Sequence, residues 1–293
     1  MAPGAGSGAP FTLLAVHAHP DDEASSTGGL LLRAAAEGQR TVLVTCTNGE
    51  WGEVLDRRLS RLRPRERPED RARLGEIRLE ELREAARILG VGGLYPLGYR
   101  DSGMAGWASN ADPASFARQP IEGPAGRLAR IIREHRPHVL VTYDAKGGYG
   151  HPDHVMAHRA AMAALEEAER PAPDQAPWRV PKVYHTAFSR KRLLRAWRLL
   201  RLLGQKTPMN RPGFREELFG SAEEEISARV DIRPYLPLKW RALKAHRSQI
   251  GGSAFWRLMR ITARWTFPDE TFGLIRSDVP VRRPEASLFE GLG

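Results

Sequence analysis

Val16-His17-Ala18-His19-Pro20-Asp21-Asp22-Glu23 is the stretch that decides the fold, because an apolar run ends there abruptly in two histidines and three acids. The residues from 11 to 16 have the composition of a buried strand. Small polar and glycine residues from 25 to 29 then lead toward a helix, so the histidines and acids are expected on the turn between the two elements. In an open α/β sheet, turns of this kind carry the chemistry.

The rest of the chain repeats this alternation of strands and helices. Residues 41–47 form an apolar, β-branched run that stops at Asn48-Gly49, which predicts a second, buried and parallel strand. Further strands are expected at 94–97, 138–143, 182–188 and 227–232, and helices at 25–37, 71–89, 127–136, 153–169, 190–203 and 240–249. The pattern predicts a Rossmann-like α/β fold with a mostly parallel sheet, helices on both faces and the active site at the carboxyl edge of the strands.

A second polar motif follows the strand expected at 138–143. Gly147-Gly148-Tyr149-Gly150-His151-Pro152-Asp153-His154 has the pattern of a glycine-rich turn into a helix, and Pro152 suits the first helical turn, where its missing N–H needs no partner. Because the carboxyl ends of parallel strands share one edge, the two motifs are expected to converge there. Their candidate site residues are His19, Asp21, Asp22, Tyr149, His151, Asp153 and His154.

These residue types suit a metal-dependent hydrolytic site. A His-Asp-His set from both motifs would leave one zinc position open for water, as in catalytic zinc sites. Zinc lowers the pKa of such a water to about 7, and a neighbouring carboxylate can take its proton. A histidine and a tyrosine opposite would stabilise an oxyanion and protonate a leaving nitrogen. The alternative, helix caps and solvated surface histidines, accounts less well for two matching motifs after separate strands.

Composition sets broad limits. The 293 residues are 41% hydrophobic, which is enough for a substantial core, and we expect one domain over 11–293, with a flexible tail at 1–10 and a variable portion from about 190. No run of about 18 apolar residues and no signal-peptide pattern is present, so a cytoplasmic protein is expected. Cys46, the only cysteine, excludes an intrachain disulfide and is expected to be a buried strand residue.

The formal charge of +10 is concentrated in two basic stretches, 57–67 and 190–206. Such clusters are most often solvated faces, so nucleic acid is not expected as a partner. Docking of 190–206 on an anionic membrane surface is an alternative that is not favoured, although the leucines and Trp197 of this amphipathic segment would allow it. The sequence leaves the oligomeric state open.

The two motifs resemble those of the LmbE/PIG-L family of zinc-dependent N-acetylglucosaminide deacetylases. Residues 17–23 and 148–154 carry the resemblance, and 45–50 and 100–104 strengthen it. It covers Phe11 to about Ala168, and the C-terminal third only through patches such as 244–249. Within the family, the chain is most similar to the mycothiol-pathway branch, which comprises a deacetylase of an N-acetylglucosaminyl-inositol and the mycothiol-conjugate amidase. Gly150 agrees with the deacetylase.

The resemblance implies a division of roles within the first motif. His19 and Asp22, with His154 from the second motif, would ligate Zn²⁺, and Fe²⁺ could occupy the same ligands in the cell. Asp21 would act as the general base. His17 and Glu23 would lie outside the ligand set and only support it, and His246, expected on a helix, is not assigned to the site.

The second motif and two loops complete the implied site. His151 would support the oxyanion or act as an acid, held by Asp153, and Tyr149 would help to polarise the acetyl carbonyl. Glu50 and Arg100 would line the sugar pocket.

We therefore expect a zinc-dependent deacetylase or amidohydrolase that acts on a linear amide C–N bond. It would remove the N-acetyl group from a small N-acetylglucosaminyl conjugate, of the inositol type or similar, and release acetate. Two alternatives stay open: a thiol-conjugate amidase of the same family, and a non-catalytic basic module that binds nucleic acid or anionic lipid. The aglycone is also open between inositol, malate, a lipid and an antibiotic scaffold, because 190–206 has no counterpart in the recognised pattern.

Overall fold

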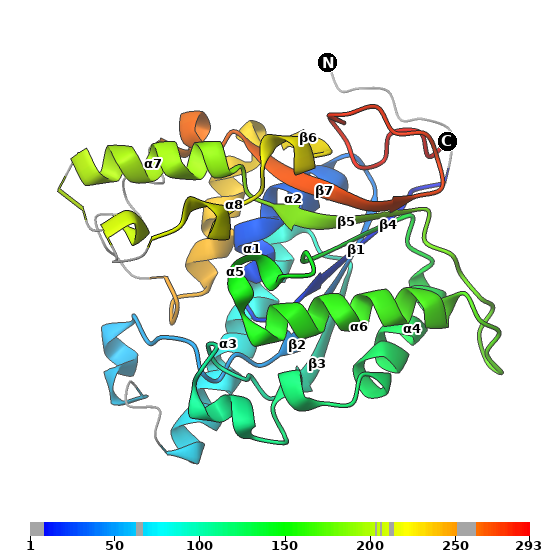
Figure 1. The fold of residues 1–293 in the computed structure, drawn as a ribbon. Coiled ribbons are helices and arrows are strands. Elements are labelled where there is room, and N and C mark those ends of the chain that lie inside the picture. Colours follow the sequence, from blue (N-terminus) through cyan, green and yellow to red (C-terminus); the bar gives the residue numbers. More distant parts are fainter. Residues whose placement is uncertain (1–8, 63–66, 203, 206, 211–213, 251–261) are drawn as a thin grey trace.

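The computed structural model describes residues 9–62, 67–202, 204–205, 207–210, 214–250 and 262–293 (Figure 1). The strands of these ranges form one sheet in the order β3-β2-β1-β4-β5-β7-β6. Their bounds are β1 Thr12–His17, β2 Arg40–Thr47, β3 Gly93–Tyr99, β4 Val139–Thr142, β5 Lys182–Ala187, β6 Ala228–Asp231 and β7 Asp269–Ser277. Every strand expected from the sequence is present, and β7 is an additional one. Most of the tail expected at 1–10 lies outside the described residues, as do parts of both basic stretches.

The sheet is mostly parallel, as expected. Strands β1 to β5 run parallel to one another, whereas β7 runs antiparallel to both β5 and β6. The chain moves outward from β1 through β2 to β3 and then returns to β4 on the other side of β1. The order therefore reverses between β1 and β4, and a Rossmann-like sheet forms its ligand crevice at such a reversal.

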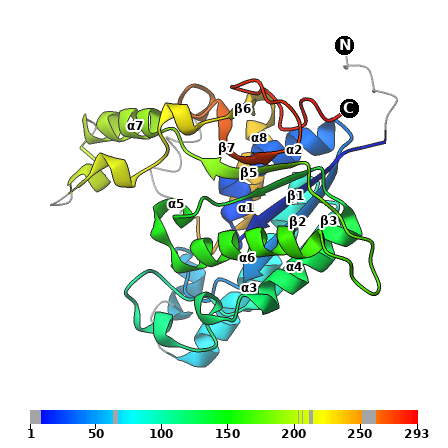
Figure 2. The ribbon, with the colours of Figure 1, turned by 45° about the vertical axis from the view of Figure 1, so that its right-hand side comes forward.

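Helices cover both faces of the sheet (Figures 1 and 2). Leu13 and Ala15 of β1 pack toward one face, and Leu14 and Val16 pack toward the other, so the strand is apolar on both sides. The first face is covered by α2 (Gly28–Ala36), α3 (Pro68–Leu89) and α8 (Leu236–Ala245), and the second by α4 (Glu122–His135) and α6 (Pro152–Ala168). This burial on both sides explains why β1 can be recognised as an unbroken apolar run.

The remaining helical elements are short, apart from α7. Among them are α1 (Asp22–Ser26), α5 (Gly147–Gly150) and α7 (Arg190–Leu202), with 3₁₀ turns at Arg57–Leu62, Ala108–Ala111, Phe116–Arg118, Pro208–Asn210, Glu216–Leu218, Glu223–Glu225 and Arg233–Tyr235. Helix α1 directly continues the first motif, and α5 is the glycine-rich turn of the second. Both motifs therefore sit on short turns between a central strand and a longer helix.

The expected helix at 240–249 is wrong in its bounds. Helix α8 begins at Leu236, because Pro237 suits a first helical turn, and it ends at Ala245. His246 is the residue after the helix, with φ −77° and ψ 58°, rather than a position within it. The direction of its side chain is therefore not set by the geometry of a helix, as the expected bounds had implied.

Helix α7 packs Leu194 and Leu200 inward, and acids from elsewhere in the chain compensate part of its charge. Arg192 forms an ion pair with Asp269, and Arg198 lies 3.7 Å from Glu216. Within the described ranges, every helix is too short or too polar to cross a lipid bilayer.

Candidate metal centre and active-site cavity

The two polar motifs meet at the carboxyl ends of β1 and β4, as expected. These strands are hydrogen-bonded neighbours, with Leu13 opposite Val139 and Ala15 opposite Val141. Beyond their ends the imidazole rings of three histidines come together. The ring centroid of His19 lies 4.5 Å from that of His151 and 5.2 Å from that of His154. The sheet thus unites residues that lie more than a hundred positions apart in the chain.

Asp22 lies close to a ring nitrogen of both His19 and His154, the other two predicted metal ligands. Asp22 Oδ2 lies 3.3 Å from His19 Nδ1 and 3.5 Å from His154 Nε2. Two ligands each about 2.1 Å from a tetrahedral zinc ion would lie about 3.4 Å apart, so both separations match an edge of such a site. Moreover, His154 Nε2 is buried and makes no hydrogen bond within the described residues. An orphaned buried nitrogen beside a carboxylate is the environment of a metal ligand.

Two overlapping groups also bring donor atoms within 4.8 Å of one another: His19, His151 and His154, and His19, Asp101, His151 and Asp153. Both groups depend on His151, whose Nδ1 already accepts the backbone N–H of Asp153 at 3.2 Å. The set predicted from the sequence, His19, Asp22 and His154, is not one of these two groups. The position of Asp22 Oδ2 near a nitrogen of each histidine is compatible with it, and the set stays a prediction.

Tyr143, which the sequence analysis did not assign to the site, holds Asp22 in place. Its hydroxyl donates to Asp22 Oδ2 at 2.7 Å and accepts the backbone N–H of Ala18 at 2.8 Å. The backbone N–H of His19 also donates to Asp22 Oδ2, at 2.9 Å. The carboxylate is thus oriented by two donors before any ligand binds.

The ring nitrogens of His17 contact two side chains that do not belong to the ligand set. Its Nε2 lies 2.8 Å from Thr27 Oγ1, and its Nδ1 lies 3.3 Å from the Tyr143 hydroxyl. Neither nitrogen is therefore left unpaired, and the supporting role of His17 stays a prediction.

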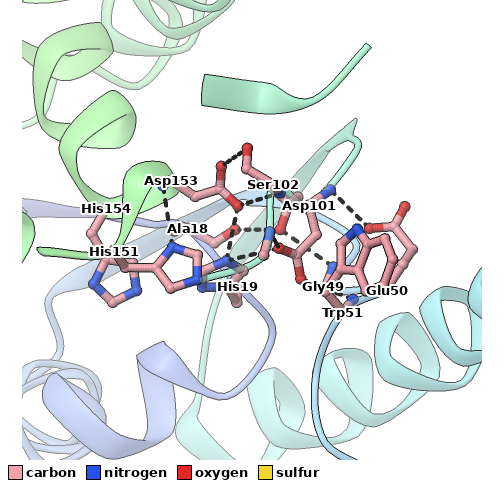
Figure 3. A network of polar contacts seen from close by, with 12 residues as sticks. Ala18, His19, Gly49, Glu50, Trp51, Asp101, Ser102, His151, Asp153 and His154 are labelled. Carbon is pink, nitrogen blue, oxygen red and sulfur yellow. Dashed lines mark hydrogen bonds and ion pairs between the residues drawn. The ribbon is translucent and has the colours of Figure 1, made fainter. Parts of the chain in front are cut away.

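The carboxylate of Asp153 is directed at His19 (Figure 3). Its Oδ2 lies 3.1 Å from His19 Nε2 and accepts the backbone N–H of Ser102 at 2.9 Å, while the Ser102 hydroxyl donates to Oδ1. His151 receives only the backbone N–H of Asp153, because His151 is the N-cap of α6 and its Nδ1 accepts a first-turn N–H. The backbone N–H of Asp153 thus bonds to His151, whereas the carboxylate of Asp153 contacts His19.

Charges in this cluster shift the pKa values in opposite directions. Burial lowers the pKa of His19, but the carboxylates of Asp101, Asp153 and Asp22 outweigh burial and raise it well above the usual value. Burial raises the pKa of Asp22, but His154 and His19 hold it well below the usual range. Burial and the charges of His19 and His154 lower the pKa of His151 to about 3. The ring of His151 is therefore neutral near pH 7.

Asp21 lies beside the ligand set in an unusual backbone conformation. Its φ of 112° falls in the left-handed region, which a residue other than glycine adopts only when its surroundings hold it there. The buried guanidinium of Arg78 lies 3.0 Å from Asp21 Oδ2 and also donates to the carbonyls of Pro20 and Gly49. Burial raises the pKa of Asp21 to about 6, although Arg78 opposes this shift.

A cavity of about 310 Å³ opens in front of these groups. The two motifs contribute His19, Asp21, Asp22, Tyr149 and His151 to its wall. Loops and helix α3 contribute further residues, among them Trp51, Glu53, Arg78, Asp101 and Trp107. Tyr149 is 58% exposed and its ring meets that of His154 edge-on at 5.1 Å. The cavity thus combines carboxylates, a cation and aromatic surfaces, which suits a small polar ligand.

Glu50 and Arg100, which were expected to line the sugar pocket, are not among the residues of the cavity wall. Glu50 Oε2 accepts the backbone N–H of Asp101 at 3.0 Å, so this carboxylate shapes a loop of the wall (Figure 3). Arg100 is largely exposed and pairs with Asp112 at 3.1 Å. The neighbouring Glu53 and Asp101 line the cavity in their place.

Comparison with known proteins gives consistent matches. Residues 14–165 match the family described as PIG-L: GlcNAc-PI de-N-acetylase. A protein of Thermomonospora curvata named 1D-myo-inositol 2-acetamido-2-deoxy-alpha-D-glucopyranoside deacetylase is 42% identical over 292 residues, covering 96% of each chain. The N,N'-diacetylchitobiose deacetylase of Pyrococcus horikoshii has a TM-score of 0.61 at 20% identity, covering 90% of this chain and 83% of that one. The zinc-inhibited form of teicoplanin deacetylase Orf2 has a TM-score of 0.55 at 21% identity, covering 92% and 99%. At such identities the two structures bear on the fold alone.

Proposed function

We propose that this chain, which belongs to the PIG-L family, is a metal-dependent hydrolase that removes the acetyl group from an N-acetylglucosaminyl conjugate. The observation that carries the proposal is the position of Asp22 Oδ2, 3.3 Å from His19 Nδ1 and 3.5 Å from His154 Nε2, with Asp21 adjacent. The name of the Thermomonospora curvata relative, which matches over nearly its full length, supports an inositol conjugate as the first substrate to test. The reaction would take place in the cytoplasm.

His19, Asp22 and His154 would hold the metal. When bound, a divalent ion there would supply Lewis-acid chemistry, in which it acidifies a water molecule and polarises a carbonyl oxygen. We assign zinc as the first ion to test because two imidazoles and a carboxylate suit it, and Fe²⁺ as the second. The zinc inhibition named for Orf2 is a reason to measure the ion rather than assume it.

Asp21 would act as the base. Its carboxylate lines the cavity next to the ligand set, and a pKa raised to about 6 lets it both accept and return a proton near neutrality. Water adds to the acetyl carbon and gives its proton to Asp21. The C–N bond then breaks, the proton passes to the departing nitrogen, and acetate and a free amine result.

His151 would donate to the oxyanion rather than act as the acid. Its Nδ1 accepts the N–H of Asp153, so the proton of the neutral ring is on Nε2 and the Nε2–H remains as a donor. Tyr149 stands exposed at the cavity wall, where its hydroxyl would add a second donor to the acetyl carbonyl. The rings of Trp51 and Trp107, with centroids 6.0 Å apart, supply an apolar surface for a sugar face.

The proposal is tested by measuring acetate release from N-acetylglucosaminyl-inositol and N-acetylglucosaminyl-malate with enzyme reconstituted with Zn²⁺ or Fe²⁺. Acetate release from the inositol conjugate is expected. A thiol conjugate of the de-N-acetylated sugar is included, because release of the cysteinyl group without acetate would identify the amidase alternative. Salt-sensitive binding to nucleic acid or anionic vesicles, with no hydrolysis of any of these substrates, would contradict an enzymatic role.

A further inference from the structure

Glu23 and His246 form a buried pair that contacts the backbone of Asp21. Both side chains are 0% exposed, and Glu23 Oε1 lies 2.7 Å from His246 Nε2. The two residues are 223 positions apart, and His246 lies outside residues 14–165, to which the family match is confined. The pair therefore connects the first motif to a C-terminal segment that the family match does not cover.

The other oxygen of Glu23 holds the backbone of Asp21. Glu23 Oε2 accepts the Asp21 N–H at 2.9 Å, so the two oxygens of this carboxylate serve His246 and Asp21 respectively. A buried carboxylate is costly unless both oxygens are satisfied, and here its partners are a ring nitrogen and the N–H of a strained residue. This bond is made by the N–H of a residue whose φ, 112°, lies in the left-handed region.

The side chain of Asp21 is held separately, by Arg78 at 3.0 Å. Arg78 also donates to the Pro20 carbonyl, and Glu23 accepts the Asp21 N–H, so the peptide that joins Pro20 to Asp21 is bonded at both ends. The Glu23 bond acts on the nitrogen about which φ of Asp21 turns. Relaxation of that φ toward ordinary values would move the Asp21 carboxylate relative to His19 and Asp22.

His246 has no other side-chain role in the described residues. Its Nδ1 is buried and makes no hydrogen bond there, so Nε2 to Glu23 is its polar contact. The segment that carries it is anchored independently, because Ser248 donates through its N–H and its hydroxyl to the buried carboxylate of Glu81, at 2.9 and 2.7 Å. His246 is thus presented to Glu23 from a fixed position.

We propose that Glu23 and His246 are positioning residues for Asp21: His246 orients the Glu23 carboxylate, and Glu23 fixes the backbone of Asp21 in the strained conformation from which its carboxylate faces the cavity. This inference rests on the proposed function, in which Asp21 is the base. It assigns no contact with substrate or metal to either residue.

The test compares Glu23→Ala and Glu23→Gln, and His246→Phe and His246→Gln, in the full-length metal-loaded enzyme. The glutamine at 23 keeps an acceptor for the Asp21 N–H, and the glutamine at 246 keeps an N–H donor, whereas alanine and phenylalanine remove them. Glu285→Gln is the matched control, because Glu285 is a buried carboxylate bonded to Lys182 and Tyr184, away from the cavity. The measurements are kcat and KM for acetate release, bound metal, and the φ of Asp21 in a crystal structure of each variant.

Loss of the Glu23 acceptor is expected to lower kcat about 100-fold, the effect of misplacing a catalytic group by about 1 Å. KM and metal content should stay within about twofold of wild type, both glutamine variants should recover most of kcat, and Glu285→Gln should match wild type. In Glu23→Ala, Asp21 should leave the left-handed region. The proposal is overturned if Asp21 keeps its φ in folded Glu23→Ala, if kcat stays within twofold, or if metal is lost instead of kcat. If the wild-type enzyme releases no acetate, the proposed function is refuted. The positioning of Asp21 by Glu23 and His246 is then still tested by the φ of Asp21 in the crystal structures.

Discussion

Asp153 Oδ2 lies 3.1 Å from Nε2 of His19, so the carboxylate that opens the second motif's helix orients a ligand of the first motif. The other ring nitrogen of His19 is left facing Asp22, 3.3 Å away. A carboxylate that accepts the outer N–H of a metal-bound imidazole fixes the tautomer of the ring and strengthens it as a ligand.

Asp153→Asn should therefore weaken metal binding rather than only slow turnover. Loss of this kind of second partner typically lowers metal affinity 10- to 100-fold. Competition with a fluorescent chelator measures the affinity, and Asp112→Asn, which alters a carboxylate paired with Arg100 at the surface, is the control. If affinity is unchanged and only kcat falls, Asp153 serves His151 instead.

Tyr143→Phe tests the support behind Asp22. The change removes the donor to Asp22 and leaves the buried N–H of Ala18 without its acceptor, which should destabilise the fold by about 1–3 kcal/mol. Metal affinity should also fall, by about tenfold. Urea unfolding and chelator competition report the two effects. Tyr95→Phe is the matched control, since the Tyr95 hydroxyl contacts His135 away from the cavity. Equal behaviour of the two variants would show that the Asp22 contact is unimportant.

Asp21→Ala and His154→Ala should fail in different ways. Without its base, Asp21→Ala should retain stoichiometric metal and lose about 10²–10⁴-fold in kcat. His154→Ala should lose the metal itself, because the ligand that makes no hydrogen bond in the described residues is gone. Elemental analysis beside acetate release separates the two results. Full activity of Asp21→Ala would exclude Asp21 as the base.

Charge reversal on α7 should leave turnover unchanged. Lys191, Arg195 and Arg201 are exposed and lie outside the cavity wall. The triple change to glutamate should keep kcat/KM for a small conjugate within about twofold, at both low and high salt. Sedimentation with anionic vesicles tests the alternative that α7 docks on a membrane. If the wild-type protein binds the vesicles and the triple variant does not, that alternative is supported.

The sequence predicts much of the fold and the two motifs, because β1 and β4 are buried on both faces and appear as continuous apolar runs. Strand β7 gives a weaker signal because Gly273 interrupts it. A Cβ at that position would collide with the ring of His185 on the neighbouring strand, so the interruption has a packing cause that only the sheet reveals.

The contacts made by long side chains could not be predicted. Arg78 lies in an arginine-rich stretch, and nothing local distinguishes it from its exposed neighbours; its burial follows from contacts with Pro20 and Asp21, 57 or more positions earlier. The position of Glu50 outside the cavity wall has a similar cause, since the loop folds its carboxylate onto the backbone of Asp101. The contact of His246 could not be predicted either, because the sequence did not show that α8 ends at Ala245.

The pairing of β1 with β4 also has a kinetic consequence. The His19–Asp153 contact spans 134 positions, and the predicted ligands come together only once these two strands have paired across that loop. Because closing so long a loop is slow, we expect this contact to form late in folding. Metal should then have little influence on the refolding rate, because the chain captures it after the rate-limiting step, and should instead slow unfolding. Bound metal would therefore extend the lifetime of the native enzyme without increasing the rate at which it folds.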